Sequence, residues 1–170
     1  MHRLRLPLLG SMVLGLGVLA LLGAGLAQPP TAVAAAEGGF SYSVSSSKAT
    51  VTGCSPTPCA ESITIPATLG GFPVTAIDAW AFRGPRVSAV TLPVGLLTIG
   101  ESAFEGTSLV SLSIPSTVTT IEAQAFRDTR YLLSVDFGTS SPNVGAAAFR
   151  DASALQTISF GTGAPSIGPS

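Results

Sequence analysis

The sequence predicts a mainly β fold in which short coils stack into a solenoid. The dipeptide Ala-Phe returns at spacings of 22, 22 and 23 residues. Each copy also contains a short alternating apolar pattern that is typical of a β-strand, such as Leu112-x-Ile114, and proline or glycine follows that pattern. A period of about 20 to 29 residues with a strand in each copy indicates a solenoid, because no single repeat can bury its own apolar side.

Stacking of the coils is expected to supply the core. A β-branched residue stands five positions before the phenylalanine of each copy. Equivalent side chains then lie above one another, about 4.8 Å apart along the direction of strand pairing. The predicted core columns are Ile77, Ile99, Ile121 and Val144; Phe82, Phe104, Phe126 and Phe149; and Leu92 and Ile114.

Residues 1–34 are predicted to be a secretory signal peptide. Arg3 and Arg5 precede an apolar run over residues 6–27, and small residues of the A-x-A type follow it. An uncleaved membrane anchor is the alternative, because the run is long enough to span about 30 Å of hydrocarbon. The expected cleavage site is Ala34, with Ala36 and Ala27 as alternatives.

Removal of this leader changes the chemistry available to the chain. It takes away the only histidine, His2, and leaves six of the eight basic residues against nine acidic ones. Nucleophile systems of the Ser/His/Asp or Cys/His kind and ordinary zinc sites need an imidazole, so we expect no catalytic site, no metal site and no cofactor. A glycosidase needs only two carboxylates, but no pair of them stands out in the sequence. The slightly acidic balance argues against nucleic-acid binding.

Residues 35–62 are predicted to form an N-terminal cap. The chain alternates from Phe40 to Val44, turns at a run of serines, and alternates again from Ala49 to Val51, which indicates a hairpin. Such a hairpin would cover the apolar side chains and strand edge that a terminal coil otherwise exposes to water.

The two cysteines of the chain lie in this cap. Cys54 and Cys59 are five positions apart in a proline-rich loop. In an exported protein, an even pair across such a loop indicates a disulfide. The redox or metal alternative lacks a C-x-x-C spacing and any further ligand.

Two copies of the repeat are regular enough to compare in full. They read V-x-x-V-x-L-P-x-x-L-x-x-I-G-x-x-A-F over residues 87–104 and L-x-x-L-x-I-P-x-x-V-x-x-I-x-x-x-A-F over residues 109–126. This pattern resembles the BspA-like leucine-rich repeat family, and the resemblance covers approximately residues 63–167. It implies a curved right-handed solenoid of parallel strands over residues 63–170, with about four coils plus a partial one, on a bacterial secreted or surface protein. Some members of that family serve in adhesion to host or matrix proteins.

The chain departs from the family pattern in two respects. Thr107 and Thr129 stand where the family usually has cysteine or asparagine, so hydroxyls are expected to replace the buried amide ladder. In a later copy, Ser141 stands where earlier copies have an aliphatic residue.

Outward positions of the predicted strands carry small, mostly hydroxylated residues. A flat polar face of this kind suits a broad contact with a protein or glycan, although it is equally consistent with an ordinary soluble β surface. It lacks the Trp, Tyr and Arg anchors that dominate binding energies. The two candidate columns are Ser111, Ser134 and Thr157, and Ser113, Asp136 and Ser159.

Trp80 and Tyr131 are the aromatic candidates for a binding surface. Equivalents of Trp80 in the other copies are small or polar, so its indole is either an exposed anchor or packed beneath the hairpin. The chain ends at Ser170, soon after Ile167 begins another coil, so weak self-association through this end is expected.

Together these features predict a secreted or cell-envelope-associated, adhesin-like module that binds a protein or glycan and is not an enzyme. No membrane contact is expected after cleavage of the leader. The alternative is a structural element that self-associates through its open C-terminal coil.

Overall fold

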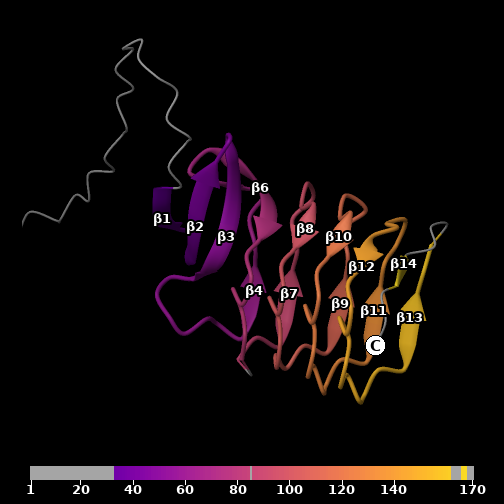
Figure 1. Ribbon diagram of the computed structural model, residues 1–170. Helices are drawn as coiled ribbons and strands as arrows, with labels where there is room; N and C mark the ends of the chain where they lie inside the picture. Colours follow the sequence, from indigo (N-terminus) through magenta and orange to yellow (C-terminus); the bar gives the residue numbers. More distant parts are fainter. Residues whose placement is uncertain (1–32, 85, 162–165, 168–170) are drawn as a thin grey trace, which may run out of the picture.

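The chain folds into an N-terminal antiparallel sheet that continues into a solenoid of short parallel strands (Figure 1). The computed structural model describes residues 33–84, 86–161 and 166–167. The described residues contain no helix, and therefore none that is long and apolar enough to cross a membrane. The solenoid and cap expected from the sequence are confirmed. The leader expected over residues 1–34 lies almost entirely outside the described residues.

Three strands form the cap: β1 (Val33–Glu37), β2 (Phe40–Ser45) and β3 (Lys48–Cys54). β2 and β3 form the predicted hairpin, and Ser46 and Ser47 adopt positive φ at its turn. β1 was not expected, because a run of alanines carries no alternating pattern. It pairs antiparallel with β2, and the cleavage candidates Ala34 and Ala36 lie within it.

The solenoid begins where β3 pairs in parallel with the next strand of the same sheet. That sheet continues through β6 (Phe72–Ile77), β8 (Thr98–Ile99), β10 (Thr120–Ile121), β12 (Asn143–Val144) and β14 (Ser166–Ile167). β5 (Thr68–Leu69) pairs antiparallel with β6.

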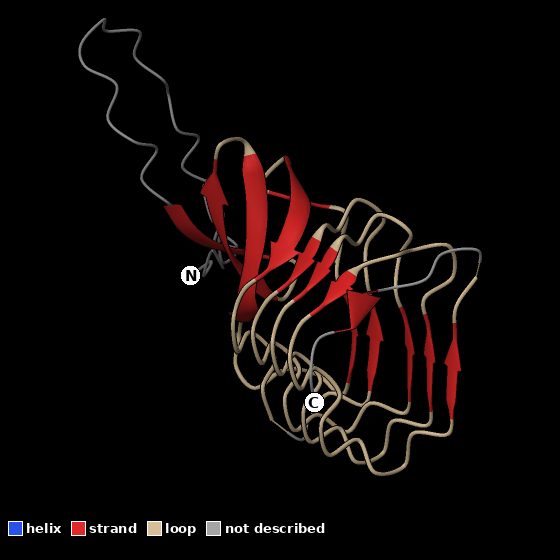
Figure 2. Cartoon of the chain, turned by 45° about the vertical axis from the view of Figure 1, so that its right-hand side comes forward, coloured by secondary structure: helices blue, strands red, loops and turns tan. Residues whose placement is uncertain are grey.

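A second set of strands runs along another side of the coils, with loops between the two sets (Figure 2). One sheet pairs β4 (Ser62–Thr64) with β7 (Ala89–Thr91). The other contains β9 (Ser111–Ser113), β11 (Ser134–Asp136) and β13 (Thr157–Ser159).

A ladder of phenylalanine rings forms the centre of the core. Successive rings of Phe82, Phe104, Phe126 and Phe149 are stacked, with centroids 5.2, 5.4 and 5.2 Å apart. Phe40 of β2 closes the ladder at the cap end by an edge contact with Phe82 at 6.2 Å. The core columns expected from the sequence are buried, except that Phe149 is only partly buried. Burial of aromatic rings is the largest apolar contribution to a core of this kind.

Positive φ values recur at one position of every coil. Trp80, Ser102, Gln124 and Ala147 have φ between 52° and 58°. Each stands two residues before a phenylalanine of the ladder, so the backbone bends left-handedly at the same point in every coil. Trp80 is 57% exposed, so packing of its indole beneath the hairpin is wrong.

Buried hydroxyls close the turn that follows each of three phenylalanines. Thr107 Oγ1, Thr129 Oγ1 and Ser140 Oγ donate to the carbonyl oxygen three residues earlier, at 2.8, 2.7 and 2.7 Å. The expected replacement of an amide ladder by hydroxyls is therefore correct for both threonines. Ser141 was aligned with a position that is aliphatic in earlier copies, but it is exposed. Ser140 is the buried serine, and its hydroxyl closes the turn after Phe137.

Replacement of Thr129 by valine is expected to lower the free energy of unfolding by about 1–3 kcal/mol, because it leaves the buried Phe126 carbonyl without this donor. Urea denaturation measures the change. Thr119→Val is the control, since the Thr119 hydroxyl donates to Leu97 O at an exposed site. Equal losses in the two variants would contradict a structural role for the buried hydroxyl.

Candidate binding surface

Strands β9, β11 and β13 bring six of the predicted binding residues onto one face. Ser134 lies in register with Ser111 and Thr157, and Asp136 lies in register with Ser113 and Ser159. All of them are exposed apart from Ser134, which is half-buried. Side chains of a strand alternate between its two sides, so Leu112 and Val135 fill the core while these six face outward. We call the six residues the hydroxyl face.

Asp136 is the only charged member of the hydroxyl face. Ser159 Oγ donates to Asp136 Oδ1 at 2.7 Å, and the Gly138 backbone N–H donates to the same oxygen at 2.9 Å. These two donors stabilise the ionised carboxylate, so the pKa of Asp136 lies below its ordinary value of 3.8. The carboxylate therefore stays charged and fixes the Ser159 hydroxyl on the next coil.

This arrangement predicts a pH dependence of stability. Because the folded protein lowers the pKa of Asp136, the stabilisation is present above 3.8 and is lost as the pH falls through the lower folded value. We expect Asp136→Asn to lose less stability than the wild type between about pH 5 and about pH 2. Ser159→Ala should shrink the same pH dependence. Identical acid profiles of the wild type and Asp136→Asn, measured by urea denaturation, would disprove the coupling.

Exposed apolar side chains border the hydroxyl face, and the sequence indicated Tyr131 among them but neither Val110 nor Leu133. Val110 and Leu133 directly precede β9 and β11, are 48% and 42% exposed, and lie on neighbouring coils joined by the Leu133 N–H to Val110 carbonyl bond of 2.8 Å. Alternation places Val110 on the same side as the buried Leu112, but the chain bends before the strand and turns Val110 outward. Tyr131, 64% exposed, stands two residues before Leu133. We call Val110, Tyr131 and Leu133 the apolar rim.

Trp80 does not join this surface. It follows β6, which belongs to the other sheet, and is exposed in the loop that leads to β7. The structure thus separates the two aromatic candidates and keeps only Tyr131 beside the hydroxyl face.

Several charged side chains outside the hydroxyl face pair with one another. Arg83 contacts Glu105 on the next coil at 3.4 Å, and Asp128 contacts both Arg127 and Arg130. Surface pairs of this kind contribute about 0 to 1 kcal/mol each. In the part of the chain that the structure describes, no group of three or more His, Cys, Asp or Glu could hold a metal ion.

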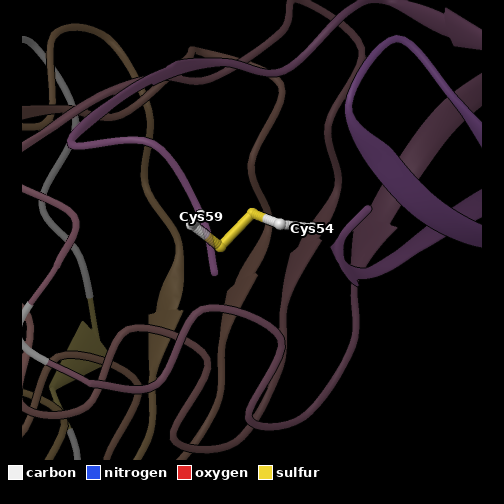
Figure 3. The surroundings of a disulfide bond; sticks show 2 residues. All are labelled: Cys54 and Cys59. Carbon is white, nitrogen blue, oxygen red and sulfur yellow. A yellow bond between two sulfur atoms is a disulfide. The ribbon is translucent and has the colours of Figure 1, made fainter. Parts of the chain in front are cut away.

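The predicted disulfide is present between Cys54 and Cys59. It joins the end of β3 to the loop that leads to β4 (Figure 3). Residues of this loop line two pockets, one of about 630 Å³ and one of about 520 Å³.

The repeat pattern places the chain among known proteins. Residues 55–170 match the model of the BspA type leucine rich repeat region, in six copies. The chain belongs to the BspA-type leucine-rich repeat family. In this BspA-type protein the match begins at residue 55, inside the disulfide loop, and so earlier than the expected first copy at Ile63.

Solved structures show the same solenoid. A leucine-rich cell surface protein from Faecalibacterium prausnitzii has a TM-score of 0.57 and 20% identity, over 75% of this chain and 39% of that one. A leucine-rich repeat protein of T. pallidum has a TM-score of 0.58 and 22% identity, over 71% of this chain and 68% of that one. The pneumococcal vaccine antigen PcpA has a TM-score of 0.50 and 16% identity, over 78% and 48%.

These identities establish a shared fold and nothing finer. The chain spans 39% of the F. prausnitzii protein and 48% of PcpA. No curated protein shows significant similarity to the sequence.

Proposed function

We propose that this chain is a secreted or cell-surface module that binds a protein or glycan through the hydroxyl face and the apolar rim, and that it carries no catalytic activity. The observation that carries the proposal is the exposure of Tyr131, Leu133 and Val110 beside a flat, registered row of hydroxyls. Interfaces combine a few buried aromatic or aliphatic anchors with a surrounding polar rim. The apolar rim supplies the anchors, and the hydroxyl face supplies the polar surroundings.

The setting of the module follows from its family. A leader over residues 1–34 would export the chain, and an oxidising compartment would maintain the disulfide between Cys54 and Cys59. The proposed partner is a protein or glycan met outside the cell, because the slightly acidic chain offers nothing for nucleic acid. No membrane contact is proposed for the exported form.

The proposal is tested with a panel of extracellular-matrix proteins and glycans, on which binding of the wild type is compared with that of Tyr131→Ala and Leu133→Ser. Loss of an anchor costs about 2 kcal/mol or more, so each variant should bind its ligand at least about thirtyfold more weakly. Val94→Ser is the control, because Val94 is an exposed apolar residue in the turn after β7. Retained binding by both rim variants, or an equal loss in Val94→Ser, would overturn the assignment.

A second candidate function is self-association through the last coils. β13 is the terminal strand of its sheet among the described residues, and Ile158 and Phe160 are 40% and 41% exposed. Apolar side chains on an unpaired strand edge are a template for another chain. Light scattering over a wide range of concentration tests this candidate, and Ile158→Lys should reduce any growth of the mean mass. A strictly monomeric wild type would rule it out.

A further inference from the structure

The loop closed by the Cys54–Cys59 disulfide is the centre of a second surface, on the cap and away from the hydroxyl face. The two pockets that it lines, of about 630 and 520 Å³, share Cys54, Pro58, Cys59 and Arg86. Both volumes fall in the range of about 300–1,000 Å³ that is typical of ligand sites. Because the two pockets share lining residues, one extended ligand can reach both of them.

Strand β4 forms one wall of the smaller pocket. All three of its residues, Ser62–Thr64, line that pocket, whereas no residue of β7 does. Among the described residues, β4 pairs with β7 alone. The pocket therefore lies along the edge of β4 that faces away from β7.

The backbone of β4 directs hydrogen-bonding groups toward this pocket. The Ile65 N–H donates to Thr91 O, and Glu61 O accepts from the Ala89 N–H, so residues 61 and 65 point their backbone groups toward β7. Backbone groups alternate along a strand, and Ser62 and Thr64 therefore point theirs to the opposite side. An open strand edge of this kind is a template for pairing with an added strand.

The charge of the site is positive. Arg86 lines both pockets and Arg83 lines the larger one, whereas neither lining contains Asp or Glu. Arg83 pairs with Glu105, but Arg86 forms no ion pair with any residue that the structure describes. A ligand with a carboxylate beside Arg86 would balance this charge.

We propose that an extended polypeptide segment carrying a carboxylate binds here, adding as a strand to the open edge of β4 with its carboxylate at Arg86. Backbone hydrogen bonds from Ser62 and Thr64 supply affinity, as in other cases of strand addition. Arg86 supplies selectivity for the acidic segment. This site is separate from the hydroxyl face and does not depend on the function proposed for that face.

The test is a fluorescence-anisotropy titration of the protein with a short, labelled, amidated peptide of alternating valine and threonine that carries one central glutamate. We expect it to bind about two- to fivefold more tightly than its glutamine analogue, and Arg86→Gln should remove this difference. Added salt should weaken the binding of the glutamate peptide but not that of its amidated glutamine analogue. A third peptide, with glutamine at the centre and a free C-terminal carboxylate, distinguishes a terminal from a side-chain carboxylate, and tight binding of either acidic peptide supports the proposal.

Strand addition is tested at Thr64. Thr64→Pro removes the N–H that points into the pocket but keeps the pairing of β4 with β7, because proline is tolerated on an open edge. This variant should lose at least about fivefold in affinity for every peptide, whereas Thr64→Val, which keeps the N–H, should bind as the wild type does. Unfolding curves of both variants verify that the solenoid is intact.

Three results of the peptide titrations would overturn the proposal. They are the absence of peptide binding to the wild type, equal preference for glutamate in Arg86→Gln, and full binding by a folded Thr64→Pro. The proposal would also be overturned if the protein self-associates, if Thr64→Pro abolishes this self-association, and if the peptides do not compete with it. Such a result would assign the edge of β4 to a second copy of the chain. The variants Tyr131→Ala and Leu133→Ser should bind the peptides as the wild type does. This result separates the test of the β4 edge from the test of the proposed function.

Discussion

Replacement of Phe104 by alanine is expected to lower the free energy of unfolding by about 3–5 kcal/mol, the loss typical of a large aromatic ring removed from a core. Phe104 is fully buried and stacks on Phe82 and Phe126 at 5.2 and 5.4 Å. Its removal leaves a cavity in the middle of the ladder, so the coils on either side lose their shared contact. Urea denaturation followed by circular dichroism measures the loss.

Phe160→Ala is the matched control for this prediction. Phe160 also stacks on another ring, that of Phe137 at 5.2 Å, but it is 41% exposed. Its removal should cost about 1 kcal/mol, since little enclosed volume is lost. A change in the denaturant slope would indicate that the two halves of the solenoid unfold separately, as repeat proteins can when an interface is weakened. Similar losses in the two variants would contradict a core centred on Phe104.

The second large effect is expected at Gly100, where a side chain has no room. A Cβ at this position would lie 2.7 Å from the Ile77 carbonyl oxygen and 2.8 Å from the Ala79 backbone nitrogen on the preceding coil. Both neighbours are backbone atoms, so the coils themselves must move apart. We expect Gly100→Ala to lower the free energy of unfolding by about 1–3 kcal/mol, the usual cost of overpacking.

Glu122 occupies the equivalent position one coil later and provides the control. It already carries a Cβ, and its exposed carboxylate accepts only a hydrogen bond from the Glu101 N–H. Glu122→Ala should therefore cost less than about 1 kcal/mol. If Gly100→Ala is as stable as the wild type in the same urea titration, close contact of the coils at Gly100 does not limit their spacing.

Much of the core could be predicted because each coil repeats one environment. Phe104 and Phe126 recur at a fixed period, and stacking buries both for the same reason. The disulfide could also be predicted, since two cysteines in a short loop leave one pairing. β1 could not, because its alanines fit a strand, a turn or a cleavage site equally well in sequence.

Only part of the candidate binding surface could be predicted from the sequence. Sequence placed Ser134 and Asp136 outward correctly, because they alternate with the buried Val135. It missed Val110 and Leu133, which lie directly before their strands and are exposed although alternation places them on the buried side.

By itself, the sequence determined the solenoid, its phenylalanine ladder and the hairpin cap, because periodic apolar residues can be buried only by stacking. Tertiary structure alone decided which apolar side chains stay exposed, and it alone placed Arg86 beside the open edge of β4 and the disulfide loop. The physical reason is that burial of a repeated position follows from its neighbours in adjacent coils, whereas a surface site depends on where separate segments of the chain meet in space.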